Sequence, residues 1–265
     1  MLDGAIDLHL PIAAQWRLYA LGVVQGRRHH PPIDPVAAWL IAAHPHLAPR
    51  FVAPSVLSMM RARSRAIDSL IVERLQEAEA RSEKVRFVSF GGDLDARWYR
   101  LRNHLGTSVH THAEIDEPGL LGQKHELLRE SHFTEEWDTI EQCRVPMVEW
   151  AGAVRPNGTT LVVLEGVANR IGPSALLPLL DALRRIEGVE CIVDLPGFRT
   201  VADGPKSIVL PVKEGDTLPL ATATLSEMGW SIAQDMRMAR RPPVRAPRGG
   251  PVCTAVEALR VLHLR

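Results

Sequence analysis

Short, almost wholly apolar segments alternate with longer helical segments through the middle of the chain. A segment without apolar–polar alternation is typical of a strand that is buried on both faces of a sheet. Parallel strands need a crossover between them, so this order predicts an α/β fold with a doubly wound, mostly parallel sheet. The predicted strands are VRFVSF (85–90), SVHTHAEI (108–115), CRVPMVEW (143–150), TTLVVLEG (159–166) and VECIVDLPG (189–197), and the helical segments cover 116–142 and 172–188.

Helical segments precede this region and a pair of strands follows it. Residues 13–24 and 34–44 are predicted helices, the second with Asp34 as N-cap and Pro35 at its first position. Residues 54–80 form one long predicted helix, and 229–239 and 256–265 a closing antiparallel pair. We therefore expect a helical cap at 1–53 and a ligand-binding domain at 54–265. The long helix has an apolar stripe at helical spacing, made of Val56, Met60, Ile67, Leu70, Ile71 and Leu75.

Charge and cysteine content exclude several classes of protein. The chain has 31 Lys and Arg residues and 31 Asp and Glu residues, so its charge gives no general attraction to nucleic acid or to an anionic membrane. Its three cysteines lie far apart, which argues against a disulfide framework and suits a reducing compartment. No signal peptide and no apolar run of bilayer-spanning length is evident. We expect a soluble, cytoplasmic protein.

The turn after the first predicted strand has an unusual composition. Gly91 and Gly92 are followed by Asp93 and Asp95, whereas a dinucleotide-binding turn reads G-x-G-x-x-G. Two acids would repel a pyrophosphate but suit a ligand that has an ammonium or sulfonium group. This favours S-adenosylmethionine (SAM) over a nicotinamide dinucleotide, although a turn rich in glycine and aspartate is more often only a turn.

Two further acids end predicted strands that should reach the same edge of the sheet. Asp116 lies where an acid can accept hydrogen bonds from ribose hydroxyls. The alternative is that Asp116 caps the helix that begins at the following Pro118 and Gly119. Glu165 ends an apolar strand just before a glycine, and its alternative role is to hold a backbone amine.

Arg63 lies near the inward stripe of the long predicted helix. A guanidinium on a buried face needs a carboxylate partner. That partner is Asp68, another acid of the protein, or the carboxylate of a bound amino-acid cofactor. Arg61 and Arg65 are interpreted as solvated charges.

These features occur together and in order, and they resemble the leucine carboxyl methyltransferase family of class I SAM-dependent methyltransferases, which includes bacterial polyketide O-methyltransferases. The matching segments are RSRAID, FGGDLDARWYRL, AEIDEPGLLGQK and LVVLEGV, and the resemblance covers roughly residues 10–195. It implies a Rossmann-like sheet with an antiparallel C-terminal strand, SAM as cofactor, and an N-terminal helical cap that covers the substrate pocket.

The resemblance also implies roles for individual residues. Cofactor binding is implied for Arg63 (methionyl carboxylate), Gly91, Gly92 and Asp93 (close approach at the first turn), Asp116 (ribose hydroxyls), Glu165 (methionyl ammonium), and Glu149 and Trp150 (adenine amine and ring face). Trp150 could equally be a core residue. Substrate binding is implied for Arg17 and Tyr19 on the N-terminal segment, and Arg170 is a further substrate candidate because the run after EGV differs from that of the family.

Two positions depart from the family pattern. Asp93 stands where the third position of the glycine turn is usually glycine, and an aspartate tolerates a left-handed backbone better than most residues do. After EGV the family usually has an aromatic residue, often tyrosine, but here the run is ANRIG, with Arg170. The arginine favours an anionic substrate, and both departures leave room for a protein with weakened activity.

The sequence therefore predicts an O-methyltransferase of secondary metabolism that acts on a carboxylate or hydroxyl of a small or polyketide-like metabolite. No residue is assigned as catalytic and no metal is expected, because His110 and His112 alternate on one strand without a third ligand. The proline-rich termini could hold a second copy of the chain in a homodimer. One alternative is a cofactor-binding partner protein without catalysis. The other is an NAD-dependent oxidoreductase, against which the paired acids and the missing third glycine count.

Overall fold

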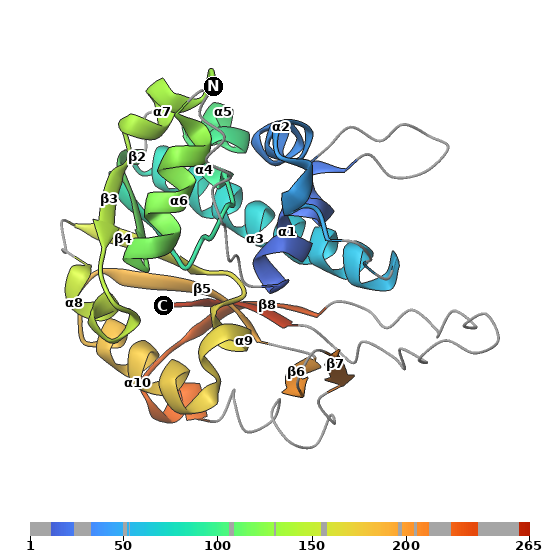
Figure 1. Cartoon of the computed structure of the whole chain (residues 1–265). Helices are drawn as coiled ribbons and strands as arrows, with labels where there is room; N and C mark the ends of the chain where they lie inside the picture. Colours follow the sequence, from blue (N-terminus) through green and yellow to red (C-terminus); the bar gives the residue numbers. More distant parts are fainter. Residues whose placement is uncertain are drawn as a thin grey trace.

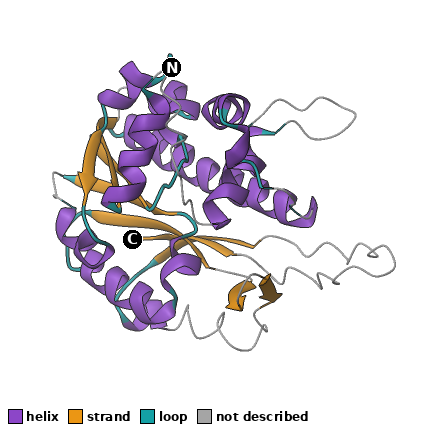
Figure 2. Cartoon of the chain, in the orientation of Figure 1, coloured by secondary structure: helices purple, strands orange, loops and turns teal. Residues whose placement is uncertain are grey.

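The computed structural model shows a central sheet with helices packed on it (Figures 1 and 2). It describes residues 12–23, 33–49, 52, 54–105, 109–129, 131–154, 158–195, 198–203, 206–211, 224–237 and 260–265. The predicted α/β class is confirmed, with strands and helices alternating along most of the described chain.

Seven strands form the central sheet in the order β3-β2-β1-β4-β5-β9-β8. The five from β3 to β5 are parallel, and β9 is antiparallel to both of its neighbours. The fold is therefore Rossmann-like and mostly parallel, with an antiparallel C-terminal strand, as the sequence predicted. The strands are β1 (Val85–Phe90), β2 (Val109–Asp116), β3 (Glu141–Arg144), β4 (Thr159–Leu164), β5 (Val189–Leu195), β8 (Ile232–Arg237) and β9 (Arg260–Leu264).

Helices cover both faces of this sheet, which explains why β1, β4 and β5 have so few polar residues. One face packs on the long helix α3 (Pro54–Ala80), where Phe87 and Leu161 meet Ile67 and Ile71. The other face packs on α8 (Trp150–Ala153), α9 (Val167–Ile171) and α10 (Pro173–Arg184), where Val88 lies in the same cluster. The bounds of α3 and all six residues of its predicted apolar stripe are confirmed as helical and buried.

The N-terminal helices α1 (Ile12–Gly22) and α2 (Pro35–Ala43) pack against each other. They also pack on the carboxyl-terminal side of the sheet. They share an apolar cluster with α4 (Arg97–Arg100), α6 (Pro118–Leu128) and α7 (Thr134–Asp138). Asp34 is the N-cap of α2, as predicted, and its Oδ1 accepts from the amides of Val36 (2.9 Å) and Ala37 (3.1 Å). Its Oδ2 accepts from the amide of Ala96 at 3.2 Å, so one carboxylate joins this helix to the turn after β1.

Several local predictions were wrong. The segment 143–150 is a strand only to Arg144, because Pro146 has no amide hydrogen to continue the ladder, and η2 (Met147–Glu149) and α8 follow. The segment 116–142 is two helices, α6 and α7, that end where β3 begins. A hairpin of β6 (Phe198–Asp203) and β7 (Lys206–Pro211) was not predicted. The remaining described helices are η1 (Pro45–Leu47) and α5 (Arg102–Leu105).

Arg61 is also a correction, because it is not a solvated charge. Its side chain is buried, and its guanidinium donates to the backbone carbonyls of Ala20 and Val23 at the end of α1. The last carbonyls of a helix generally lack a donor within the helix, and the arginine supplies one here and ties α1 to α3. Arg65, one turn further on, is exposed as predicted.

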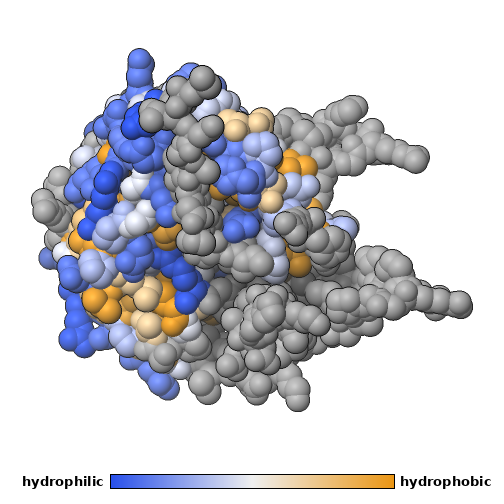
Figure 3. Space-filling model, viewed as in Figure 1, coloured by the Kyte–Doolittle hydropathy of each residue, from blue (hydrophilic) through white to orange (hydrophobic). Residues whose placement is uncertain are grey.

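The described surface is mostly hydrophilic on the face shown in Figure 3, with hydrophobic residues gathered toward the lower left of that view. The described residues include two large exposed hydrophobic side chains, Val148 and Met236. No helix within the described ranges has the length and apolar character needed to cross a membrane.

A cluster of charged residues at the start of β5, away from the carboxyl ends of the parallel strands, gives a first test of stability. Glu190, at the start of β5, accepts from Arg74 at 2.9 Å and lies 2.9 Å from Nε2 of His263. Burial opposes its ionisation, but the hydrogen bonds from His263 and Arg74 lower its pKa to about 2. A depressed carboxyl pKa stabilises the fold above the unfolded pKa, and this contribution is lost as the pH falls through the folded pKa.

We expect Glu190→Gln to lower the free energy of unfolding at pH 7 by about 2 kcal/mol. The difference from the wild type should shrink between about pH 4.5 and pH 2, where the native carboxylate becomes protonated. Urea unfolding at a series of pH values measures this. A difference that stays constant over that pH range would contradict the assignment.

Candidate active site

Four neighbouring strands bring acidic side chains to one edge of the sheet. β2, β1, β4 and β5 are parallel, so their carboxyl ends lie side by side. β2 ends at Asp116, β4 is followed by Glu165, and Asp194 is near the end of β5; all three are buried. The turn that follows β1 adds Asp93 and Asp95.

The turn after β1 has an unusual backbone. Gly91 has φ +56° and Asp93 has φ +49°, so both residues lie in the left-handed region. The amide of Asp93 donates to Asp116 Oδ2 at 3.0 Å, which fastens the turn to the end of β2. A side chain on Gly91 would approach Val167 and Trp150 at 3.1 and 3.2 Å. The first glycine is therefore needed for its conformation and for the space above it.

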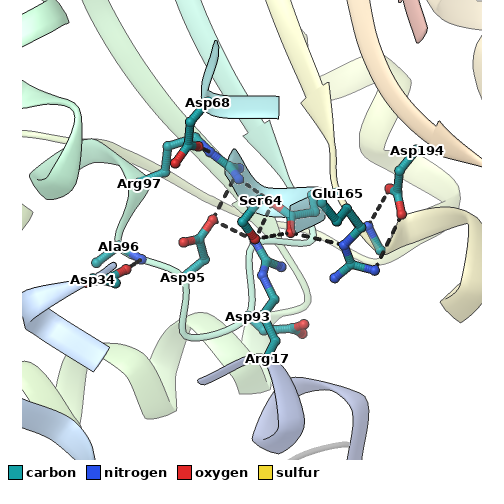
Figure 4. A network of polar contacts seen from close by, with 12 residues as sticks. Arg17, Asp34, Ser64, Asp68, Asp93, Asp95, Ala96, Arg97, Glu165 and Asp194 are labelled. Carbon is teal, nitrogen blue, oxygen red and sulfur yellow. Dashed lines mark hydrogen bonds and ion pairs between the residues drawn. The ribbon is translucent and has the colours of Figure 1, made fainter. Parts of the chain in front are cut away.

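Glu165 lies at the centre of the polar network in Figure 4. Its Oε1 accepts from Arg63 Nε (3.1 Å) and Ser64 Oγ (2.6 Å), both on α3, and its Oε2 accepts from Arg97 and from Arg17 (3.4 Å). Burial opposes ionisation of this carboxyl, but the guanidiniums of Arg17, Arg97 and Arg63 outweigh it and hold its pKa well below the usual range. Glu165 is thus a buried carboxylate that draws α1, α3 and α4 to the end of β4.

Asp95 is the second centre of the same network. It accepts from Arg17 at 2.5 Å, pairs with Arg97 at 3.1 Å and accepts from Arg100. Burial opposes ionisation, and the three arginines, Arg100 first, hold its pKa well below its ordinary value. The acids of this turn were interpreted as partners for a cationic ligand, but the structure gives Asp95 three cationic partners from the protein itself.

Arg63 and its surroundings answer the question of its partner. Its buried guanidinium bonds Glu165 and, at 3.4 Å, Asp194 Oδ2, so the partners are protein acids other than Asp68. Asp68 instead accepts from Arg97 and Arg100, each at 2.7 Å. Asp194 Oδ1 accepts from the amide of Gly166 at 2.6 Å, so the turn after β4 is fastened to β5.

Arg170 on α9 bridges the two remaining acids. Its Nη1 donates to Asp93 Oδ1 at 3.0 Å and its Nη2 to Asp116 Oδ1 at 2.8 Å. Its guanidinium carbon lies 5.0 Å from the centre of the Trp150 ring, within the range of a cation–π contact. Burial first, and then the charge of Asp116, raise the pKa of Asp93 to about 6 despite Arg17 and Arg170. Asp93, which departs from the family pattern, therefore contacts Arg170, which lies in the run after EGV that also departs from it.

Acidic groups outnumber basic groups at this edge. Among the described residues, this network contains five arginines and seven carboxyl groups. Arg170, Asp93 and Asp116 form one bonded group, and the other nine residues form a second group that interacts with it through the charges of Arg17 and Asp93. Burial raises the pKa of Asp34 and Asp194 as well as that of Asp93, as expected where the negative charge is not fully compensated. The members are Arg17, Arg63, Arg97, Arg100 and Arg170 with Asp34, Asp68, Asp93, Asp95, Asp116, Glu165 and Asp194.

Gly92 has a different role from Gly91. A side chain on it would place its first carbon 2.5 Å from Glu114 Oε1 on β2. Glu114 is buried and accepts from Lys124 Nζ at 2.6 Å, and the same ammonium donates to the carbonyl of Asp95 at 2.6 Å. Burial raises the pKa of Glu114 to about 7, although Lys124 opposes this. The Lys124–Glu114 pair thus binds the turn through the carbonyl of Asp95 and leaves no room for a side chain at Gly92.

We expect Gly92→Ala to lower the free energy of unfolding by about 1–3 kcal/mol, because the new methyl group displaces Glu114 from Lys124. Thermal unfolding measures this, and Gly122→Ala on α6 is the matched control, since nothing lies within 4 Å of a side chain there. If both variants unfold at the wild-type temperature, Glu114 can move aside without loss of stability, and the predicted effect of Gly92→Ala is wrong.

The other predicted residues lie at different distances from this network. Arg17 is part of it, whereas Tyr19 is half-buried against the apolar cluster around Met60 on α3. Trp150 is fully buried, stacks on Phe90 with ring centres 5.4 Å apart, and donates to the carbonyl of Val145 at 3.2 Å. Its neighbour Glu149 is exposed on η2.

Asp116 does not cap α6, because the N-cap of that helix is Glu117 and no side chain caps it. Instead, Asp116 Oδ1 accepts from the amide of Glu117 at 2.8 Å in addition to Arg170. Within the described ranges, no group of three or more His, Cys, Asp or Glu residues is arranged to hold a metal ion.

The sequence interpretation missed several members of the network. Arg97 and Arg100 are three residues apart directly after the glycine turn, which is a signal for two cations on one face of a short helix. Asp194 follows an apolar run and ends a buried strand in the same way as Glu165 does. Ser64 gave no signal in the sequence, and Asp68 was considered only as a partner of Arg63, because the roles of both depend on the crossing of α3 over the strand ends.

Comparison with known proteins identifies a family. The profile of the leucine carboxyl methyltransferase family matches residues 33–181, which is more than half of the chain. Among curated proteins, no match is found.

Solved structures with a similar fold share little sequence with the chain. Magnesium protoporphyrin IX methyltransferase (ChlM) from Synechocystis PCC 6803 with bound SAM has a TM-score of 0.45 and 11% identity, covering 82% of this chain and 86% of that one. The glycopeptide N-methyltransferase MtfA complexed with SAM has a TM-score of 0.40 and 12% identity, with 73% and 92% covered. The LepI complex with SAM has a TM-score of 0.45 and 15% identity, with 73% and 46% covered.

Proposed function

Because the chain belongs to the leucine carboxyl methyltransferase family and is a SAM-dependent methyltransferase, we propose that it methylates an oxygen of a small acid. The acceptor is a carboxylate or hydroxyl of a small or polyketide-like metabolite, which places the reaction in secondary metabolism. The family match favours SAM over the nicotinamide dinucleotide that the first turn alone left open.

The excess of carboxyl groups at the strand ends is the observation that carries this proposal. SAM has a sulfonium and an ammonium group against one carboxylate, so its net charge is positive. A buried cluster with two more acids than arginines gains from binding such a cation. The residues present therefore fit the cofactor.

The proposed contacts assign one polar group of the cofactor to each strand end. Glu165 would hold the ammonium, Arg63 the methionyl carboxylate and Asp116 the ribose hydroxyls, while the turn at 91–93 passes close to the chain of the ligand. Trp150 would cover the adenine ring and Glu149 would accept from its amine. Bound SAM supplies an electrophilic methyl group on a positive sulfur.

Arg17 supports an anionic acceptor. Its buried Nε has no hydrogen-bond partner among the described residues, although its Nη2 bonds Asp95 and Glu165. A buried donor without a partner is costly, and a ligand carboxylate would satisfy it. A carboxylate acceptor is already ionised near neutral pH, so the protein needs only to orient it and exclude water. Tyr19 and Arg170 are the further acceptor contacts that we propose.

The decisive experiment is methyl transfer from radiolabelled SAM to a panel of small carboxylic acids, phenols, amines and thiols. A methyl ester releases labelled methanol in mild alkali, whereas methyl ethers and methylamines do not, so the acceptor atom is identified together with the acceptor. Label found only on nitrogen or sulfur would overturn the proposed oxygen transfer and leave the methyltransferase class intact.

We expect Arg17→Met to raise the KM for a carboxylate acceptor about tenfold, as befits a charge-assisted hydrogen bond worth about 1.5 kcal/mol. Steady-state kinetics at saturating SAM measure this. Arg61→Met is the matched control, because Arg61 is an equally buried arginine that binds the end of α1 away from the strand ends. Equal effects of the two variants would show that Arg17 acts only through the position of the cap.

A cofactor-binding protein without catalysis is the second candidate, and the contact of Arg170 with Asp116 is the observation that favours it. Mass spectrometry of the small molecules released from the denatured protein separates the candidates. S-adenosylhomocysteine indicates turnover, SAM alone indicates binding without transfer, and NAD would indicate the oxidoreductase alternative.

A further inference from the structure

The side chain of Arg170 covers two features that we assign to the cofactor's nucleoside half, Asp116 and Trp150, and it reaches the turn at Gly91 beside them. Its Nη2 bonds Asp116, its guanidinium carbon faces the Trp150 ring at 5.0 Å, and its Nη1 lies 3.6 Å from the place of a side chain on Gly91. A planar cation that faces an aromatic ring and bonds a carboxylate thus lies where a base and a ribose would contact the protein.

Asp116 has too few acceptor positions for both partners. A carboxylate has about four lone-pair positions, two on each oxygen. Oδ1 accepts from the amide of Glu117 and from Arg170, so it is saturated, and Oδ2 accepts from the amide of Asp93. One position therefore remains, and it is on Oδ2. A ribose diol that donates to both oxygens needs Arg170 to leave.

The helix that carries Arg170 is short and has a glycine at each end. α9 has five residues and lies between Gly166 (φ +74°) and Gly172 (φ +72°), both in the left-handed region. Glycines at both ends can absorb backbone rotation with little strain, as hinges do. The side chain of Arg170 is also 23% exposed, whereas those of Arg17, Arg63, Arg97 and Arg100 are 5% exposed or less. Arg170 is the arginine of the network that can leave at least cost.

We propose that Arg170 is an internal competitor of the cofactor, a latch that closes the nucleoside half of the site on Asp93 and Asp116 and opens when SAM binds. This inference rests on the proposed cofactor site. Asp93 holds one side of the latch, so Asp93 and Arg170 act as a pair. The apparent affinity for SAM is then lower than the intrinsic affinity by the fraction of molecules with the latch open.

Calorimetry with S-adenosylhomocysteine tests the latch. We expect Arg170→Met to bind this ligand about tenfold more tightly than the wild type, which corresponds to a latch that is closed about nine-tenths of the time. Asp93→Asn should give a smaller gain, because the bond to Asp116 remains. 5′-Methylthioadenosine, which lacks the amino-acid end, should gain as much as S-adenosylhomocysteine does.

Arg184→Met is the matched control. Arg184 also lies near a tryptophan ring, that of Trp230, and bonds a backbone carbonyl, but it is on α10 outside the network. The affinity of the Arg184→Met variant for S-adenosylhomocysteine should equal that of the wild type. If Arg170→Met folds and binds S-adenosylhomocysteine as weakly as the wild type or more weakly, the latch is wrong and Arg170 supports binding. If neither the wild type nor any variant binds the ligand, the proposed cofactor site itself fails.

Discussion

Replacing Glu165 with alanine is expected to lower the free energy of unfolding by about 3–5 kcal/mol and to abolish measurable binding of SAM. The carboxylate is buried and holds Arg17, Arg63 and Arg97, so its removal leaves three guanidiniums without their shared partner. It also removes the proposed acceptor of the methionyl ammonium. Chemical unfolding and calorimetry measure the two effects separately.

Glu165→Gln separates charge from shape. The amide keeps the volume of the side chain but cannot neutralise the arginines, so we expect most of the loss in affinity with a smaller loss of stability. Glu190→Gln is the companion variant at the opposite edge of the sheet, and it should bind SAM as the wild type does. Wild-type affinity in a folded Glu165→Gln variant would show that this carboxylate does not contact the cofactor.

Replacing Arg63 with methionine should weaken SAM binding about 100-fold, because the proposed partner of the methionyl carboxylate is lost from a buried site. The affinity for 5′-methylthioadenosine, which has no carboxylate, should change little. Calorimetry with both ligands therefore distinguishes a lost contact from a general distortion of the site. Equal losses for the two ligands would show that Arg63 has only a structural role between Glu165 and Asp194.

Arg74→Met is the control for this experiment. Arg74 lies on the same helix, is equally buried and also binds two acids, Glu83 and Glu190, but at the other edge of the sheet. It should lose stability comparably to Arg63→Met and keep its affinity for SAM. A parallel loss of affinity in both variants would mean that the tilt of α3 controls binding.

The sheet could be predicted because its signal is local. Phe87 and Val88 point to opposite faces, and both faces are covered, so the segment had to be apolar throughout. The same criterion failed at 143–150, where an apolar run continues past Pro146 into a short helix. Asp34 was found because a cap and the helix that it begins are adjacent in the sequence.

The charge network could be predicted only in part. Asp116 and Glu165 were found because strand ends are visible in the sequence, but Asp194 was missed, and the partners of these acids come from far away. Arg17 and Asp95 are 78 residues apart, and nothing near either of them indicates the other. Arg61 was wrongly predicted to be exposed. Its burial depends on the carbonyls at the end of α1, which accept from its guanidinium and which lie far from it in the sequence.

The shared carboxylate of Asp34 limits how this enzyme can be re-engineered. One of its oxygens accepts from the first amides of α2 and the other accepts from the amide of Ala96. The helices that we propose to cover the acceptor and the segment after the turn that we propose to contact the cofactor are thus anchored to a single side chain. A chimera that exchanges the first helices for those of another protein would keep its loop geometry only if an acid at this position came with them. With the roles that we propose for these segments, an exchange of the first helices therefore changes acceptor range and cofactor affinity together.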